Sequence, residues 1–256
     1  MRLAVLMTCH NRVETTLECL KRLMLQLRPD DKVFLVDDGS TDGTGVKVIS
    51  NFPTVHLIYG DGSLFWAKGM RKAWEVATAE GEWDAYLWLN DDAMLSADAI
   101  EKMIAKDDGR SLLIGTLCDS NGRAVYGLNV NGWVNGNCVL VPRKIYETIG
   151  MICGEYAHAW ADSDYALQVR KSAFPIVDAG VVGSTEWHAL RPSLVGRRLV
   201  ERWRLLFDPK GWNLHDLWIY RRRNWSAFRA LASVIHMVCH VLFCRAEKVE
   251  CAKSSE

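Results

Sequence analysis

The sequence predicts an α/β fold in which helices cover both faces of a mostly parallel β-sheet. Apolar runs of strand length alternate with segments of helical periodicity through the first hundred residues. Such alternation is typical of βαβ units, whose crossover helices lie on the two faces of the sheet. With 256 residues, 49% of them hydrophobic, the chain is long enough for one large domain, or for one domain with an appendage.

The first half of the chain contains four predicted strands, over 3–8, 32–36, 55–59 and 86–89, and two predicted helices, over 15–27 and 66–79. The first of these helices follows the polar break at residues 9–12. Its apolar residues recur on one side, as a helix packed on a sheet requires: Leu17, Leu20, Leu23, Met24 and Leu27. These elements predict the parallel half of the sheet.

The pattern changes after Lys106. Short strands are predicted over 112–117, 124–128 and 137–141, with three Asn-Gly turns among them, at 121–122, 131–132 and 135–136. Helices over 142–149 and 162–171 and a last strand over 177–182 follow. We therefore expect an antiparallel or mixed addition beside the parallel half.

Three polar loops follow strands of the predicted parallel sheet: 37–38, 60–62 and 90–92. Since ligands bind beyond the carboxyl ends of such strands, these loops should open on one edge. The adjacent carboxylates of Asp91 and Asp92 repel each other and attract a divalent cation. Such an oxygen site suits Mg²⁺ or Mn²⁺, with phosphate oxygens as further ligands. Alternatively, one of the two aspartates caps a helix that begins near Ser96.

Other phosphate-binding and metal-binding patterns do not occur. The sequence has no Gly-x-x-x-x-Gly-Lys-Ser/Thr loop and no Gly-x-Gly-x-x-Gly after the first strand, which argues against a P-loop enzyme and a dinucleotide dehydrogenase. A metal would then be the main counter-charge for a pyrophosphate. The eight cysteines form no Cys-x-x-Cys pair, which argues against a zinc knuckle and favours a reducing compartment.

Four segments, in this order, resemble glycosyltransferase family 2, with its GT-A fold and its rhamnosyltransferase-like members: residues 6–12, 35–44, 88–93 and 160–170. The most specific is the string Val-Asp-Asp-Gly-Ser-Thr-Asp-Gly-Thr at 36–44. The resemblance implies a GT-A nucleotide-sugar domain over residues 1–190. It also implies that the loop at 90–92 matches the Asp-x-Asp motif of the family, with Asn90 as a departure at its first position.

The resemblance implies a role for each matching position. Thr8 and either Asp37 or Asp38 are expected to contact the base. The full set of expected nucleotide-binding residues is Thr8, Asn11, Arg12, Asp37, Asp38, Gly62, Lys68 and Asp91. Asp92 is expected to bind the metal, Mn²⁺ or Mg²⁺, with His188 as a further ligand.

Asp162 matches the general base of inverting family members. A carboxylate that accepts a proton makes a sugar hydroxyl a better nucleophile. The neighbouring residue is Ala161, where the family often has an acid, and Asp162 could alternatively be the N-cap of its helix. Trp133 and Trp160 are expected to line the acceptor sugar site.

The resemblance implies an inverting, metal-dependent transfer from UDP- or dTDP-sugar to a saccharide or lipid-linked saccharide, in cell-surface polysaccharide synthesis. The segment 62–68 favours dTDP-rhamnose. Two alternatives remain at this point: a non-catalytic nucleotide-sugar binder that scaffolds a membrane assembly, and a sugar-nucleotide pyrophosphorylase. The second would need a Gly- and Arg-rich phosphate loop after the first strand, which residues 9–12 do not form.

Residues 191–256 are predicted to be a basic, aromatic-rich helical tail. From Arg197 onward there are 12 basic and 6 acidic residues, against 19 and 25 before it. Arginine, tryptophan and leucine together are typical of an interfacial helix at an anionic membrane. The alternative is a helical pair that packs on the domain or forms a homodimer contact. We expect a cytoplasmic protein, peripheral on the inner face of the cell membrane, with no nucleic-acid partner.

Overall fold

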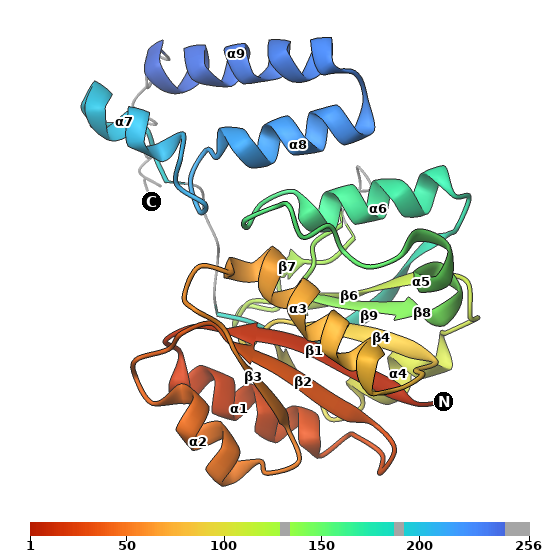
Figure 1. Cartoon of the computed structure of the whole chain (residues 1–256). Coiled ribbons are helices and arrows are strands. Elements are labelled where there is room, and N and C mark those ends of the chain that lie inside the picture. Colours follow the sequence, from red (N-terminus) through yellow and green to blue (C-terminus); the bar gives the residue numbers. More distant parts are fainter. Residues whose placement is uncertain (129–133, 187–191, 244–256) are drawn as a thin grey trace, which may run out of the picture. The chain divides into compact units, whose positions relative to one another are not determined.

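The computed structural model describes residues 1–128, 134–186 and 192–243 (Figure 1). The chain forms two compact units, Met1–His188 and Ala189–Glu256. The assignment of a nucleotide-sugar role to residues 1–190 and of a separate role to the tail stays a prediction. The α/β fold with a mostly parallel sheet and a C-terminal helical extension is confirmed.

The first unit is built on one sheet, which has nine strands within the described residues. The strands are β1 (Leu3–Cys9), β2 (Lys32–Asp37), β3 (His56–Tyr59), β4 (Ala85–Leu89), β5 (Met94–Leu95), β6 (Leu112–Cys118), β7 (Ala124–Tyr126), β8 (Cys138–Pro142) and β9 (Ile176–Ser184). Their order is β3-β2-β1-β4-β8-β6-β9-β5, with β7 paired to β6. Strands β3, β2, β1 and β4 are mutually parallel. Strand β8 runs antiparallel to β4 and β6, which is the mixed addition expected after Lys106.

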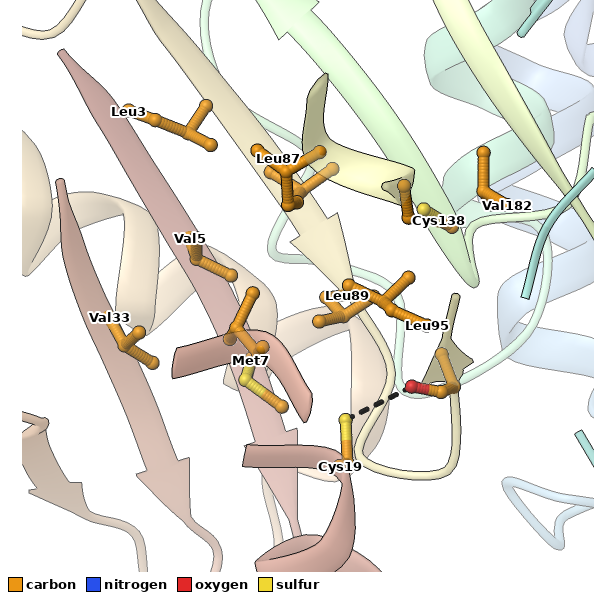
Figure 2. Close-up of a cluster of buried hydrophobic side chains, with 14 of the residues drawn as sticks. Leu3, Val5, Met7, Cys19, Val33, Leu87, Leu89, Leu95, Cys138 and Val182 are labelled. Atoms are coloured by element: carbon orange, nitrogen blue, oxygen red, sulfur yellow. Dashed lines mark hydrogen bonds between the residues drawn. The ribbon is translucent and has the colours of Figure 1, made fainter. Parts of the chain in front are cut away.

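Helices cover both faces of this sheet. The helices of the first unit are α1 (Val13–Met24), α2 (Thr44–Asn51), α3 (Phe65–Glu80), α4 (Ala99–Ala105), α5 (Arg143–Ile149) and α6 (Ala161–Lys171). On one face, Leu3, Val5 and Met7 of β1 pack in a core with Cys19 of α1 (Figure 2). On the other face, Thr8 of β1 lies against α3. The alternation of β1 side chains thus separates the two helical layers.

An aromatic cluster fills the second face. Trp74 of α3 packs against Tyr86 and Trp88 of β4, with ring centroids 5.0 and 5.8 Å apart. Tyr146 of α5 and Tyr165 of α6 join it, each within 5.9 Å of Trp74. Large buried aromatic rings provide much of the packing energy of a core. The cluster therefore fixes α3, α5 and α6 on the strand that leads into residues 90–92.

Several elements differ from those that the sequence predicted. Helix α2 was not predicted; Thr44, Gly45 and Val48 are its buried residues, while Val46 and Ile49 are exposed. Helix α1 ends at Met24 rather than at residue 27, since Leu25 points to solvent. Strand β7 ends at Tyr126 rather than at residue 128, because Gly127 has a φ of 148°.

The second unit contains three helices in its described part: α7 (Leu199–Leu205), α8 (Leu214–Asn224) and α9 (Ala227–Phe243). They share a small core around Leu194, Leu205, Leu206 and Val241. No helix in the described ranges combines the length and the apolar character needed to cross a bilayer.

Candidate active site

Three loops meet at one edge of the sheet, because β2, β1 and β4 are adjacent and parallel. They are residues 10–12 after β1, the Asp37-Asp38 pair at the end of β2, and residues 90–92 after β4. Cys9 is paired with Asp37 in the sheet, and the backbone N–H of Asp38 donates to the carbonyl of Cys9 at 2.9 Å. Two of these loops, 37–38 and 90–92, are among the three that the sequence pattern singled out. The third, 60–62, follows β3, and its Gly62 donates a backbone N–H to Oδ1 of Asp38 at 2.9 Å.

The Asp91–Asp92 pair is buried and faces one cation. Nη1 of Arg12 lies 3.1 Å from Oδ1 of Asp91 and 3.1 Å from Oδ2 of Asp92. Thr16 of α1 donates its hydroxyl to Oδ2 of Asp91 at 3.2 Å. Arg12 was expected to contact the nucleotide, and in this structure its guanidinium is the counter-charge of the acidic pair.

Helix α1 also contacts the acidic loop, residues 90–93, through Cys19. The thiol of Cys19 lies 3.2 Å from the carbonyl oxygen of Ala93, the contact dashed in Figure 2, and 3.4 Å from the carbonyl oxygen of Asn90. Burial, together with the negative charge of Asp91 nearby, raises the pKa of this thiol well above its usual value, so it stays protonated and can donate. Thr16 and Cys19 therefore position the loop, and neither was expected from the sequence.

The helix-cap alternative for the pair does not match the structure. The chain enters β5 at Met94 directly after the loop, and the N-cap residue of α4 is Asp98. Because Asp91 and Asp92 accept hydrogen bonds from Arg12, a cationic side chain 79 and 80 residues away, their arrangement is a long-range one. A local cap would not need that cation.

Electrostatics make this pair costly to keep charged. Burial raises the pKa of Asp91 to about 6; Arg12 opposes the shift and the neighbouring Asp92 charge adds to it. Burial likewise raises the pKa of Asp92, against Arg12. Oδ1 of Asp92 is buried and accepts no hydrogen bond from any described residue. Two adjacent carboxylates, one of them with a buried oxygen that accepts no hydrogen bond from a described residue, fit a hard divalent cation.

The two aspartates at the end of β2 differ in their surroundings. The carboxylate of Asp38 accepts three backbone N–H groups, from Gly62, Leu64 and Phe65, at 2.9, 3.0 and 2.9 Å. Asp38 thereby holds the loop that leads into α3. The carboxylate of Asp37 accepts one backbone N–H, from Ser40, at 3.0 Å. Both are buried, but the carboxylate of Asp38 is occupied by three backbone N–H groups. Asp37 is therefore the better candidate to contact the nucleobase of the donor.

Asn11, which has a φ of 51°, connects the loop after β1 to the loop after β2. Its side-chain oxygen accepts the backbone N–H of Thr41 at 2.7 Å, and its own backbone N–H donates to the hydroxyl of Ser40 at 2.9 Å. Gly62 is in close contact with Gly39, because a Cβ at Gly39 would lie 2.7 Å from the nitrogen of Gly62. Asn11 and Gly62 therefore shape the loops in this structure.

Thr8 and Lys68 lie next to this edge. Thr8 is half-buried and packs on α3, where a Cβ at Gly69 would lie 2.5 Å from its Oγ1. Lys68 stands in the first turn of α3 and forms no ion pair with any residue in the described ranges.

Asp162 is the second residue of α6, and the N-cap residue is Trp160, with a φ of 70°. Oδ2 of Asp162 accepts the backbone N–H of Gly136 at 3.0 Å, and Oδ1 accepts that of Ser163 at 2.7 Å. Burial raises its pKa, and these two N–H groups oppose the rise. Asp162 is thus held on the segment that precedes β8 and is not simply the cap of its helix.

A hydrogen-bonded chain connects the acidic loop to that segment. The indole Nε1 of Trp66 donates to Oδ1 of Asn90 at 2.7 Å, and the Asn90 amide also contacts the Asn137 side chain. The backbone N–H of Asn90 donates to the carbonyl of Asn137 at 2.9 Å. The ring of Trp66 covers Gly136, where a Cβ would lie 2.6 Å from Cη2. Asn90, the departure from the acidic motif, therefore acts as a structural link.

Of the remaining expected site residues, Trp160 is half-buried beside Asp162 in the sequence. Trp133 and His188 lie outside the described residues. Within those ranges no group of three or more His, Cys, Asp or Glu residues is arranged to hold a metal by protein ligands alone.

Comparison with known families identifies the chain. The profile of the family described as Glycosyl transferase family 2 matches residues 4–158, more than half of the 256 residues. The chain belongs to this family. It is therefore a glycosyltransferase of the nucleotide-sugar type, and neither the pyrophosphorylase nor the non-catalytic scaffold is supported. The match includes all three loops and ends before Asp162.

Solved structures agree on the GT-A fold. The mannosyltransferase PcManGT from Pyrobaculum calidifontis, in complex with GDP-Man and Mn²⁺, has a TM-score of 0.58 and 15% identity, over 94% of this chain and 69% of that one. S. aureus TarS 1–349, in complex with UDP-GlcNAc, has a TM-score of 0.63 and 15% identity, over 98% and 77%. No curated protein sequence matches the chain significantly. At this identity the structures establish the fold.

Proposed function

We propose that this glycosyltransferase moves a sugar from a nucleoside diphosphate to an acceptor hydroxyl with inversion, and that it needs a divalent cation held by Asp92 and Asp91. The observation that carries the proposal is the buried carboxylate pair at the strand edge, with Oδ1 of Asp92 lacking a hydrogen-bond partner among the described residues. A bound Mn²⁺ or Mg²⁺ would stabilise the negative charge on the departing diphosphate.

The protein's own residues would bind the donor around this pair. Asp37 and Thr8 would contact the base and its sugar, on loops that Asp38 and Asn11 hold in place. Lys68, which has no ion-pair partner in the described ranges, would reach a phosphate oxygen. Arg12 would remain beside the carboxylates and limit their mutual repulsion.

Asp162 would act as the general base. Its carboxylate accepts the proton of the acceptor hydroxyl as that oxygen bonds to the anomeric carbon, while the bond from this carbon to the diphosphate oxygen breaks. Attack opposite the leaving group inverts the anomeric centre. Burial supports this role, because it raises the pKa of Asp162 and makes the carboxylate a stronger proton acceptor. Trp160, the preceding N-cap residue, would line the acceptor sugar site.

We further propose UDP- or dTDP-sugar as donor, dTDP-rhamnose being favoured by residues 62–68, and a saccharide or lipid-linked saccharide of the cell surface as acceptor. The solved structures similar to this chain hold GDP-Man and UDP-GlcNAc, so a donor panel must include all three bases.

The test is to measure nucleoside diphosphate release from UDP-, dTDP- and GDP-sugars with short saccharide acceptors, with Mn²⁺, with Mg²⁺ and with EDTA. We expect turnover with one base, loss of turnover with EDTA, and a product whose anomeric configuration by NMR is opposite to that of the donor. Full turnover in EDTA would contradict the metal requirement, and a product of retained configuration would contradict the role of Asp162.

A further inference from the structure

The second unit exposes far more large apolar side chains than the first. Of the seventeen such residues exposed within the described ranges, ten lie between residues 192 and 243, a stretch about one-third as long as the first unit. They are Val195, Leu199, Val200, Trp203, Phe207, Trp225, Phe228, Leu231, Ile235 and Phe243. A concentration of this kind marks an interaction surface rather than ordinary scatter.

Helix α9 shows how the surface is built, because it is apolar on two sides. Val241 is buried in the unit's own core, and Ala230 is buried as well. Phe228, Leu231 and Ile235 are 80, 52 and 55% exposed and recur at helical spacing on the outer side. The inner side already explains how α9 is held, so the outer stripe is available for another partner.

Helix α7 carries a second stripe of the same kind. Leu199 and Trp203 of α7, and Phe207 two residues beyond its end, follow one another at four-residue spacing and are at least half exposed. The rings of Trp203 and Phe207 pack at 5.4 Å, so the stripe is an ordered feature. Because Leu205 of α7 and Val241 of α9 share one core, the two stripes belong to one folded unit.

The second unit also carries an excess of positive charge. Residues 192–243 contain nine arginines and lysines against three acids, among them Arg204 next to Trp203 and Arg229 next to Phe228. Of the three acids, Asp216 is buried and Glu201 is paired with Arg198. Asp208 is the exposed acid among the three, so exposed aromatic and aliphatic side chains alternate in the sequence with basic residues that outnumber the acids.

We propose that the second unit docks on an anionic lipid bilayer, with the outer stripes of α7 and α9 in the interfacial layer and the arginines at lipid phosphates. Aromatic rings at headgroup depth and arginines that extend toward phosphate are the features by which helices bind such an interface. A second copy of the chain fits less well, because a two-fold contact through these stripes would bring two sets of arginines together.

The test is flotation of the full chain with vesicles of phosphatidylcholine, alone or mixed with phosphatidylglycerol, without donor or metal. We expect flotation only with the anionic vesicles, and weaker binding as salt increases. Arg204→Glu combined with Arg229→Glu should weaken partitioning at least about tenfold, given the contribution of each basic residue near such a surface. Trp203→Ser combined with Phe228→Ser should remove flotation.

Two matched controls use exposed residues of the first unit: Lys21→Glu with Arg110→Glu, and Leu25→Ser with Val46→Ser. Both should float like the wild type, and all variants should keep the wild-type circular dichroism spectrum. Equal flotation with neutral vesicles, or equal loss in the controls, would overturn the proposal. The proposal would also be overturned if the chain bound no vesicles but formed a dimer in light scattering, and the Trp203→Ser, Phe228→Ser variant were monomeric. Because the flotation assay contains no donor, a negative result would contradict the membrane proposal alone and would leave the proposed glycosyl transfer untouched.

Discussion

The Asp91–Asp92 pair and Asp162 are two carboxylate sites in one unit, and they are held in opposite ways. Burial raises the pKa at both sites. The pair is balanced by the Arg12 guanidinium, whereas Asp162 is held by the neutral backbone N–H groups of Gly136 and Ser163. The surroundings, not the residue type, therefore suit one site to a cation and the other to a proton.

This comparison implies that the two sites can be disabled separately. Asp162→Asn keeps an acceptor oxygen for Gly136 but removes the proton-accepting carboxylate. We expect kcat to fall about 10²- to 10⁴-fold, the usual contribution of a general base, with donor affinity unchanged. Steady-state kinetics and donor titration measure both. Ser172→Ala, at the exposed C-terminal end of α6, is the control. A full loss of donor binding in Asp162→Asn would contradict the separation of the two sites.

The next largest effect is expected for Arg12→Gln, which leaves two buried carboxylates without a counter-charge. We expect the free energy of unfolding at pH 7 to fall by about 3 kcal/mol. Denaturant titration measures it. Arg22→Gln, which breaks an exposed pair with Glu18, is the control and should leave stability almost unchanged.

The same variant tests the pH dependence of the pair. The pKa of Asp91 is about 6 in the fold, above the ordinary value of about 3.9, so the folded state binds its proton more tightly than the unfolded chain. That contribution to stability is present below about pH 4 and is lost as the pH rises to about 6. The loss caused by Arg12→Gln should thus be smaller at pH 5 than at pH 7. An equal loss at both pH values would show that Arg12 does not act through the charges of the pair.

A smaller effect is expected where the two sites are linked. Asn90→Leu removes the partners of the Trp66 indole and of the Asn137 side chain, at a cost of about 1 to 2 kcal/mol in stability. Because Gly136 adjoins Asn137, kcat should fall as well. Thermal unfolding and kinetics measure these changes, with the exposed Asn51→Leu as control. Unchanged kcat would show that Asp162 is positioned independently of the acidic loop.

The smallest expected effect is a shift in the pH profile of kcat. Since the pKa of Asp162 is raised, the deprotonated base is lost on acidification at a pH above about 4, the ordinary aspartate range. Measurement at saturating donor and metal reports the bound enzyme. An acid limb at or below pH 4 would contradict the effect of burial on Asp162.

The positions of the loops at 37–38 and 90–92 could be predicted from the sequence because each follows a continuous apolar strand. The alternation of strands and helices then assigned them to one edge of the sheet. The resemblance at residues 36–44 and 88–93 indicated the family, which the profile match over residues 4–158 confirms.

The contacts within the site could not be predicted in the same way. The Arg12 contacts to Asp91 and Asp92 bridge 79 and 80 residues, and no local pattern indicates them. Asp37 and Asp38 are neighbours of the same type, and only the path of residues 62–65 shows that Asp38 holds that loop. One signal was overlooked: Thr16 is a polar residue on the buried side of α1, where a partner is required.

The most direct test of the division between the two sites is calorimetric titration of UDP and dTDP, with and without Mn²⁺, into the wild type, Asp92→Ala and Asp162→Asn. We predict tight binding of one nucleotide that needs Mn²⁺, is lost in Asp92→Ala and is retained in Asp162→Asn. Binding that is indifferent to both Mn²⁺ and Asp92 would contradict the assignment of the acidic pair to the cation.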